Sequence, residues 1–401
     1  MTYIEPKFNL ALLDATPEEK LAYFKRKVFA HAHLKNTFNL ALDNIEFAYS
    51  GEIVPIVGPS GVGTTELGRK IWNEYQGPVP TVDECGNVQF NANSIGIEAP
   101  HQAGRIDADY WKRLLSGILR RGGDMLIDRK IYVPPSDFIL THPVPYADPL
   151  KQGVDTLMLA TVGMLKQRDT KVVLINQADR LFPEADQAGC IRSQQILMDL
   201  AAQTRTRFVL IGGYQLVRAS SVRNNWLCGQ HIVHFRRYDK NRPEEYAIFV
   251  KALLFLLANL PTELRLKSLS EAGARQIYLR TVGCMGTAKK ALMMALQHSL
   301  RTGEPMTEDF ILRFAPNNLV ALGVAKDARL GEALLTDVDS SEVERALDAG
   351  SSEQTGDKKA FADTKQPRNG TKEARPCKVV PRIGERKSTR DPVGGRNEVP
   401  A

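Results

Sequence analysis

Eight consecutive residues have the types and spacing of a phosphate-binding loop. They are Gly58, Pro59, Ser60, Gly61, Val62, Gly63, Thr64 and Thr65. In the pattern G-x-x-x-x-G-K-[ST], glycines allow the tight turn that aims backbone N–H groups at phosphate oxygens, and the final hydroxyl binds Mg²⁺. The loop therefore predicts a nucleotide site in which Thr65 is the protein's metal ligand. The alternative, a glycine-rich turn with no ligand, stays open at this point.

The loop departs from the pattern at one position, where Thr64 stands in place of the lysine. That lysine makes a charge-assisted contact to the outer phosphates, worth roughly 1.5–3 kcal/mol. Its loss weakens nucleotide binding by about one to two powers of ten unless another cation replaces it. Arg69 and Lys70, a few residues further on, are candidates for that replacement. We therefore expect ATP and Mg²⁺ to bind weakly or not at all.

A second chemical signal lies at the end of a later apolar run. Residues 172–175 predict a buried parallel strand, which is followed by Asn176 and Gln177. In a nucleotide hydrolase this strand end carries Asp and Glu, which hold the Mg²⁺ shell and polarise the attacking water. The two amides keep the shape but lose both negative charges, and Gln cannot accept a proton at neutral pH. The pair therefore predicts impaired catalysis, although taken alone it could also end a core strand that takes no part in chemistry.

The elements that must position these residues follow from the apolar pattern. Residues 53–57 predict a strand and residues 66–75 a helix, so the loop lies between a strand and a helix, as a phosphate loop requires. Further strands are expected over 88–90, 94–100 and 207–213, core helices over 110–121, 156–167 and 190–203, and later helices over 243–260, 272–280 and 286–300. This order predicts an α/β fold, with a parallel sheet flanked by helices and a C-terminal helical lid.

The chain is expected to have four segments. They are a helical lead-in over residues 1–50, the P-loop core over 51–240, the lid over 241–330 and a tail over 331–401. Within the tail, residues 332–357 carry a net charge of −7 and residues 358–401 a net charge of +7. Both stretches are poor in apolar residues, so the tail is predicted to be disordered. Its basic half either binds nucleic acid loosely or is a solvated appendage.

Composition is that of an ordinary globular protein in a reducing compartment. The 401 residues are 43% hydrophobic and 25% charged. Five cysteines are scattered without a C-x-x-C pair, which argues against a zinc site or a disulfide framework. The longest apolar run, residues 247–260, is too short to span a membrane, and no basic-then-apolar signal opens the chain. We therefore expect a cytoplasmic protein with no membrane partner.

The order of several motifs resembles that of a known family. After the loop come Ile97-Glu98-Ala99-Pro100, Leu174-Ile175-Asn176-Gln177-Ala178-Asp179, Leu210-Ile211-Gly212-Gly213 and the stretch 281–288. This order is similar to that of transposon-encoded AAA+ proteins of the TniB/TnsC type, with the bacteriophage Mu B protein a more distant relative. The resemblance covers roughly residues 30–300. It implies that the core is a P-loop NTPase of the AAA+ class.

The resemblance also implies a function, that of an ATP-dependent target selector. Such proteins bind DNA as ATP-bound oligomers, recruit or activate a transposase, and are disassembled by ATP hydrolysis. The partners implied for this chain are DNA, a transposase or targeting protein, and either further copies of itself or an active paralogue.

The resemblance assigns family positions to several residues. The loop residues Gly58, Gly61, Gly63 and Thr65 would hold phosphates and Mg²⁺. Asn176 and Gln177 occupy the places of the metal-holding and catalytic acids, and Gly212-Gly213 that of a strand-end sensing residue. Gln230 occupies the place of an arginine given to a neighbouring subunit's ATP, for which Arg218 and Arg223 are nearby substitutes.

The departures from the family pattern point in one direction. The lysine is replaced by Thr64, the acid pair by Asn176 and Gln177, and the arginine by Gln230. Each lost charge would stabilise the transition state of phosphoryl transfer. We therefore hypothesise a catalytically impaired relative, a DNA-binding adaptor in transposition. Two alternatives stay open: an active ATPase with relocated catalytic residues, and a protein-interaction scaffold that binds neither nucleotide nor DNA.

Overall fold

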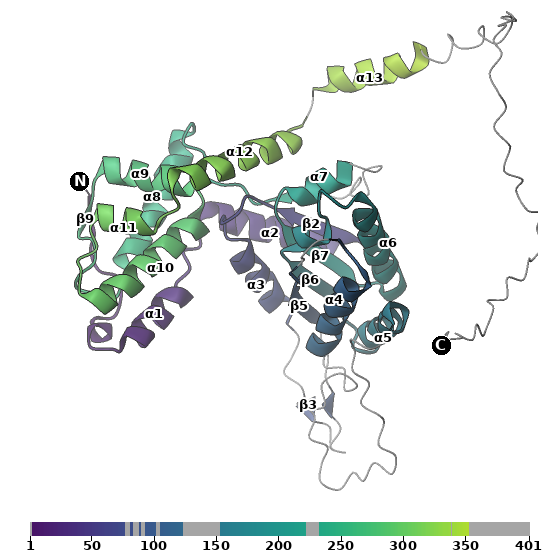
Figure 1. Ribbon diagram of the computed structural model, residues 1–401, viewed down its shortest axis with the longest axis horizontal. Coiled ribbons are helices and arrows are strands. Elements are labelled where there is room, and N and C mark those ends of the chain that lie inside the picture. The colour runs from purple at the N-terminus through teal and green to yellow at the C-terminus, as the bar shows by residue number, and fades with distance from the viewer. Residues whose placement is uncertain are drawn as a thin grey trace, which may run out of the picture. The chain divides into compact units, whose positions relative to one another are not determined.

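A computed structural model describes residues 2–76, 81–82, 88–89, 93–101, 105–122, 153–221, 232–337 and 339–352. The chain divides into two units, Met1–Thr336 and Asp337–Ala401. The first unit holds an α/β core and a helical lid (Figure 1). The expected α/β class, a parallel sheet flanked by helices and followed by a helical lid, is confirmed.

The core is a five-stranded parallel sheet with helices on both faces. Its strands are β2 (Ile53–Val57), β5 (Ser94–Glu98), β6 (Val172–Asn176), β7 (Arg207–Gly212) and β8 (Val233–His234). Their order across the sheet is β5-β6-β7-β2-β8, and every described pairing is parallel. The carboxyl ends of the strands therefore meet at one edge, where ligands of open α/β sheets bind. A separate antiparallel pair joins β3 (Thr81–Val82) to β4 (Val88–Gln89).

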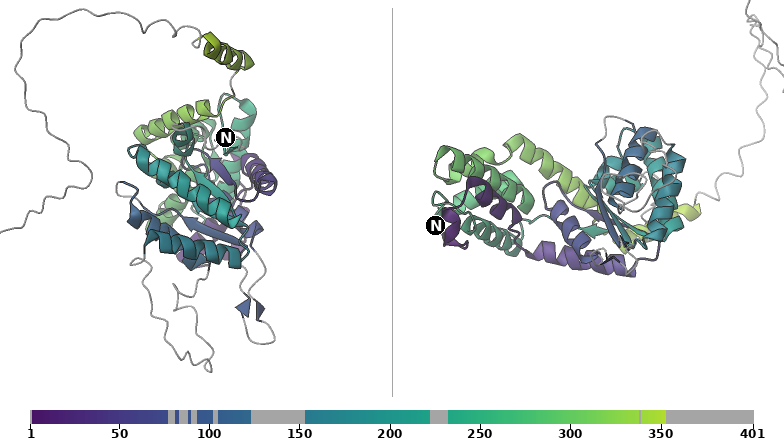
Figure 2. Two further views of the ribbon diagram at one scale, coloured as in Figure 1. Left: turned by 90° about the vertical axis from the view of Figure 1, so that its right-hand side faces the viewer. Right: turned by 90° about the horizontal axis from the view of Figure 1, so that it is seen from below.

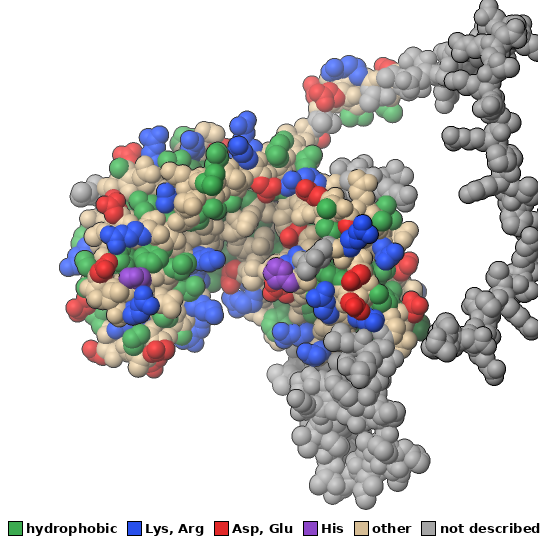
Figure 3. Space-filling model, viewed as in Figure 1, with side chains coloured by type: hydrophobic (Ala, Val, Ile, Leu, Met, Phe, Trp, Pro, Cys, Tyr) green, Lys and Arg blue, Asp and Glu red, His purple; other side chains and the backbone are tan. Residues whose placement is uncertain are grey.

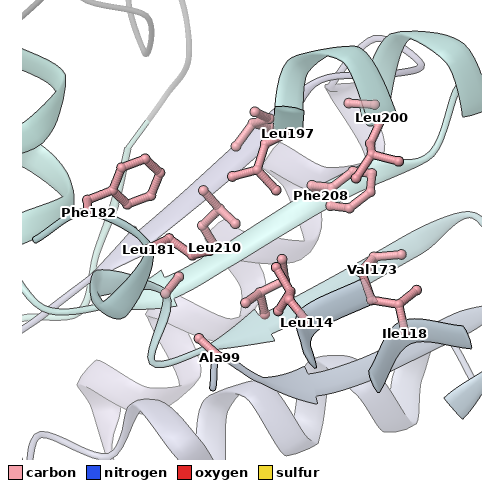
Figure 4. Packing of buried hydrophobic residues seen from close by; sticks show 14 of the residues in the cluster. Ala99, Leu114, Ile118, Val173, Leu181, Phe182, Leu197, Leu200, Phe208 and Leu210 are labelled. Carbon is pink, nitrogen blue, oxygen red and sulfur yellow. The ribbon is translucent and has the colours of Figure 1, made fainter. Parts of the chain in front are cut away.

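Alternating side chains along the strands build two apolar layers. Ile53 and Val57 of β2 belong to the cluster formed with α4 (Ala108–Arg121), α5 (Val154–Gln167) and α6 (Gln187–Thr204). Val54 and Ile56 belong to the opposite cluster, with α2 (Ala32–Phe47) and α3 (Thr64–Glu74). This is the period of two that a pleated strand imposes. Figure 4 shows the first layer, including Leu114, Ile118, Leu197, Leu200, Phe208 and Leu210.

Pro55 lies in the middle of β2, although proline is rare in central strands because it has no N–H to donate. The sheet accommodates it because β8 is short. On that side, Ile56 and Val57 are the only residues of β2 that pair with the described part of the chain, and their partners are Val233 and His234. At Pro55 the strand has a single neighbour, β7, and behaves as an edge strand there.

The lid is a cluster of helices that also includes the start of the chain. Its members are α8 (Pro243–Ala258), α9 (Glu271–Thr281), α10 (Met285–Thr302), α11 (Glu308–Phe314) and α12 (Asn318–Leu334). The first helix, α1 (Pro17–Arg26), packs against α10, and the purple N-terminal segment lies beside the green lid helices in Figure 2. Strand β1 (Thr2–Tyr3) pairs with β9 (Ser268–Leu269). The segment 1–50, expected to form one helical lead-in, is therefore divided between two parts of the fold. Helix α1 packs in the lid, whereas α2 packs on the sheet.

Helix α12 runs from the lid to the core. At its carboxyl half, Arg237 forms an ion pair with Glu332 over 2.8 Å, and Asp327 pairs with Arg218 of α7 (Gln215–Ser221). Gly331 packs against the ring of Tyr214, where no larger residue would fit. Three contacts thus fix the lid to the sheet edge near β7.

The tail differs from the expectation in its first part. Helix α12 continues to Leu334, and a further helix, α13 (Ser340–Ser352), lies in the acidic stretch that was predicted to be disordered. Good helix formers and apolar residues at helical spacing, Val343 and Leu347, favour this helix despite its charge. The predictions for residues 353–401 lie outside the described part of the chain. No described helix is long and apolar enough to cross a membrane.

Two histidines, the buried His31 and the half-buried His234, contact the hydroxyl groups of tyrosines that are distant in the sequence. His31 is only 6% exposed; its Nδ1 accepts the N–H of Leu34 to cap α2 and lies 2.8 Å from the Tyr238 hydroxyl. His234 at the end of β8 places Nε2 2.9 Å from the Tyr214 hydroxyl. Burial lowers the pKa of each imidazole to about 4, helped by His33 near His31 and by Arg236 near His234.

These histidines predict a loss of stability in mild acid. Between pH 6.5 and about 4 the unfolded imidazoles take up protons that the folded ones do not, so acid favours unfolding. Denaturant unfolding of wild type and His31→Asn at pH 7.5 and pH 5 tests this, because Asn can still cap α2 but cannot titrate. We expect the variant to lose less stability than wild type on acidification, by about 1–2 kcal/mol. An equal loss in both proteins would contradict the assignment.

Candidate functional site

The glycine-rich loop connects the end of β2 to the start of α3, and three of its glycines have structural roles. The Gly58 N–H donates to the Gly212 carbonyl over 3.2 Å, which ties the start of the loop to the end of β7. Gly61 and Gly63 have φ angles of +81° and +121°, in the left-handed region that favours glycine. A Cβ on Gly58 would lie 2.5 Å from the Phe235 carbonyl oxygen. Each of the three glycines is therefore required by the backbone of the loop.

The loop leaves several backbone donors available. The N–H groups of Gly61, Gly63, Thr64 and Thr65 have no acceptor among the described residues. The last two belong to the first turn of α3, whose N–H groups lack intrahelical partners. Free N–H groups at a helix N-terminus favour an anion. The residues present thus fit the phosphates of a nucleotide, and binding at residues 58–65 stays a prediction.

The candidate replacements for the missing lysine have other surroundings. Arg69 donates from Nε to Glu66 over 3.1 Å on the exposed side of α3. A cation that sequence reasoning missed is Lys289 of α10, which is half-buried and donates from Nζ to the Lys25 carbonyl over 2.8 Å. Burial lowers the pKa of Lys289, while the charge of Glu66 raises it and that of Arg69 lowers it, so Lys289 lies near the start of α3. Its signal in the sequence was the pair of lysines after Gly286.

The amide pair at the end of β6 lies where the sequence predicted. Asn176 Nδ2 is 3.5 Å from Thr65 Oγ1, so the strand end and the loop hydroxyl meet. Gln177 is in the left-handed region, with φ +53° and ψ +40°, which is uncommon for a residue with a Cβ. Such backbone outliers cluster at functional sites. Asn176 therefore lies beside the loop hydroxyl, and neither amide of the pair supplies a charge there.

An acid that follows the amide pair is used structurally. Asp179 lies in the short 3-10 helix Ala178–Leu181, and its Oδ1 accepts the N–H of Gly213 over 3.3 Å. A Cβ on Gly212 would lie 2.7 Å from the same oxygen. The two glycines at the end of β7 therefore bring the backbone close to Asp179, and they carry no side chain that could sense a phosphate.

A second acid, missed by sequence reasoning as a site residue, lies on the neighbouring strand. Glu98 ends β5 directly beside Asn176 in the register of the sheet. Arg180 Nη1 donates to Glu98 Oε1 over 3.2 Å and to the Ala99 carbonyl over 2.8 Å. The adjacency depends on β5 and β6 being neighbours in the sheet, which no local sequence pattern shows.

The lid contacts the loop directly. The Thr287 N–H, in the first turn of α10, donates to the Gly61 carbonyl over 2.9 Å. A Cβ on Gly286 would lie 2.6 Å from the same oxygen, and a Cβ on Gly61 would collide with the Thr287 side chain. A cavity of about 470 Å³ adjoins this contact, with Ser60, Gly61, Arg280, Thr287 and Lys290 among its lining residues. The close contact between the loop and the lid therefore requires glycine at both positions, 61 and 286.

Other predicted positions fall elsewhere. Gln230 and Arg223 lie outside the described residues. Arg218 is engaged with Asp327 and with Glu184, the latter over 3.3 Å. Among the described residues, no group of three or more His, Cys, Asp or Glu could hold a metal ion by itself. A Mg²⁺ ion at Thr65 would thus take most of its ligands from phosphates and water, as Mg²⁺ often does.

Comparisons with known proteins show distant structural similarity. No protein-family model matches the chain, and no curated protein matches it in sequence. A Walker-type ATPase of Pyrococcus abyssi is 14% identical, with a TM-score of 0.44, over 80% of this chain and 76% of that one. Domain III of the Thermotoga maritima replication initiation protein DnaA is 12% identical, with a TM-score of 0.36, over 78% of this chain and 97% of that one. Neither similarity bears on what this chain binds.

The contact between loop and lid predicts a sharp difference between two glycine substitutions. Gly61→Ala forces a Cβ into a left-handed position against Thr287, which we expect to destabilise the fold by about 1–3 kcal/mol. Gly117→Ala, in α4 with open space around it, should be neutral or stabilising by up to about 1 kcal/mol. Denaturant unfolding of both variants measures the difference. Equal stability of the two would show that the loop is not held as described.

Proposed function

We propose that the protein is a nucleotide-binding P-loop protein of the AAA+ class that binds ATP with Mg²⁺ weakly and hydrolyses it poorly or not at all. The observation that carries the proposal is the meeting of Thr65 Oγ1 with the amide of Asn176, 3.5 Å apart, beside free loop N–H groups. The backbone half of a phosphate site is retained there. The charged half, made of a lysine and two acids, is replaced by neutral side chains.

Impaired hydrolysis follows from the chemistry of these side chains. Phosphoryl transfer is catalysed by positioning and by charges that stabilise the transition state. The backbone N–H groups can position a phosphate, but Thr64 carries no positive charge. Gln177 cannot take a proton from an attacking water at neutral pH. The site is therefore expected to bind the phosphates of a nucleotide but to hydrolyse the nucleotide poorly or not at all.

The biological role we propose is that of an adaptor in DNA transposition. The order of motifs resembles that of TniB/TnsC-type proteins, and the chain carries a net charge of +7. The partners would be duplex DNA, a transposase or targeting protein, and further copies of this chain or an active paralogue. On the face shown in Figure 3, Lys and Arg side chains are mixed with Asp and Glu, so no single basic stripe marks a DNA path on that face.

A second candidate function is an active ATPase with relocated charges. The half-buried Lys289, at the start of α10 and near Glu66, favours it because it brings a cation from the lid toward α3. Its ammonium group already donates to the Lys25 carbonyl, which satisfies part of its hydrogen bonding in the present arrangement. The scaffold alternative, with neither nucleotide nor DNA bound, is an outcome of the experiments below.

Restoring the lysine tests the nucleotide site. Thr64→Lys should tighten ATP binding by about tenfold to a hundredfold, because the ammonium adds a charge-assisted contact to a retained cradle. Thr302→Lys is the matched control, because it adds the same charge at the far end of α10, about 25 Å from the start of that helix, which contacts the loop. Titration of a fluorescent ATP analogue measures both. An equal effect of the two variants, or none, would mean that the loop does not hold phosphates.

Salt dependence tests the DNA proposal. Contacts between Lys or Arg and phosphates release counterions, so affinity for duplex DNA should fall at least tenfold between 50 and 200 mM salt. Fluorescence anisotropy with labelled duplexes of two unrelated sequences measures the slope and any sequence preference. Affinity that stays flat over this range, or no binding at 50 mM salt, would exclude DNA as a direct partner.

A further inference from the structure

The carboxyl end of β5 carries an acid, Glu98, and the carboxyl end of the neighbouring β6 carries an amide, Asn176. Glu98 and Asn176 are paired residues in the register of these parallel strands. In a magnesium-dependent nucleotide site the acid stands at the end of the strand that faces the loop hydroxyl. Here that strand ends in the amide, and the acid stands one strand further away.

The Glu98 side chain starts one strand away from Asn176, close to the place where an acid would face the loop hydroxyl. Neighbouring strands of a sheet lie about 4.8 Å apart, which is comparable with the reach of a Glu side chain, and paired residues of parallel strands point to the same face. Asn176 in turn contacts Thr65, with 3.5 Å between Nδ2 and Oγ1. Glu98 and Asn176 therefore lie side by side at the carboxyl edge of the sheet, and Asn176 contacts Thr65 at the start of α3.

The Glu98 carboxylate is held at this edge and keeps one oxygen available. Arg180 donates to Oε1 over 3.2 Å and is itself anchored on the Ala99 carbonyl. Oε2 has no hydrogen-bond donor among the described residues. The Glu98 side chain is 55% exposed, whereas that of Arg180 is 21% exposed. The arginine thus holds the carboxylate from the buried side and leaves its other side open to solvent.

The other nearby acids are engaged elsewhere. Asp179 accepts the N–H of Gly213, and Glu66 accepts from Arg69 on α3. Mg²⁺ is usually held by one or two carboxylates together with phosphates and water. Glu98 differs from Asp179 in two respects, because it is paired with Asn176 in the register of the sheet and its side chain is 55% exposed, whereas Asp179 is half-buried and tied to the end of β7.

We propose that Glu98 supplies the carboxylate that favours Mg²⁺ at this site, in place of an acid at position 176. The inference rests on the proposed nucleotide binding and names the residue that makes it magnesium-dependent. Glu98 acts here as a positioning residue for the ion. The chain thereby keeps a negative charge for Mg²⁺ without placing a proton acceptor at position 177.

The test compares nucleotide binding in Mg²⁺ with binding in EDTA. Binding of the fluorescent ATP analogue to the full chain is measured under both conditions. The Mg²⁺ effect is the Kd in EDTA divided by the Kd in Mg²⁺, so a larger ratio means a stronger contribution of Mg²⁺ to binding. Glu98→Gln keeps an acceptor for Arg180 and should reduce this ratio about tenfold. Asp109→Asn, an exposed acid on α4 paired with Lys112, is the control and should leave the ratio unchanged.

A rescue variant separates a missing charge from a disturbed fold. Adding Asn176→Asp to Glu98→Gln moves the acid back to β6 and should restore the Mg²⁺ effect. A ratio unchanged in Glu98→Gln, or a reduced ratio that Asn176→Asp fails to restore, would overturn the role of Glu98 while the proposed nucleotide binding stands. Absence of binding by wild type in both conditions would overturn the proposed function and this inference together.

Discussion

The site depends on the alignment of parallel strand ends by a buried sheet. The end of β2 opens the loop, the end of β7 accepts the Gly58 N–H, and the end of β6 brings Asn176 to Thr65. None of these contacts needs a charged side chain. They need apolar strands that pack on both faces and glycines where the backbone turns or two segments approach closely. The geometry of the loop therefore does not depend on the charged side chains that phosphoryl transfer requires.

The lid adds a second constraint of the same kind. Gly61 and Gly286 face each other, and the Thr287 N–H donates to the loop. Helix α12 then fixes the lid to the core through Arg237 with Glu332 and through Gly331 against Tyr214. A ligand that changes the loop would be felt in the lid, because backbone atoms and not flexible side chains make the contact. The proposed adaptor role would use such a link between the loop and the surfaces that bind partners, whether or not hydrolysis occurs.

Much of this was readable from the sequence. Continuous apolar runs predicted β2, β6 and β7, helical periodicity predicted the core helices within a few residues, and the loop pattern placed Thr65 and Asn176 in one site. What was missed depends on tertiary neighbours. Glu98 lies beside Asn176 only because β5 is the neighbour of β6, and β8 is a strand of just two residues in the described part of the chain. His31 caps a helix and is buried only because Tyr238 reaches it from 207 positions further along the chain.

The measurement that tests the central claim most directly is ATP binding by the purified chain, followed by turnover on the same sample, with Mg²⁺ and with and without duplex DNA. Retained backbone donors with neutral side chains at positions 64, 176 and 177 predict binding that is measurable but weak, with phosphate release no faster than background. Turnover above background that Gln177→Ala abolishes would contradict impaired catalysis. No binding in any condition would mean that the loop is a structural relic.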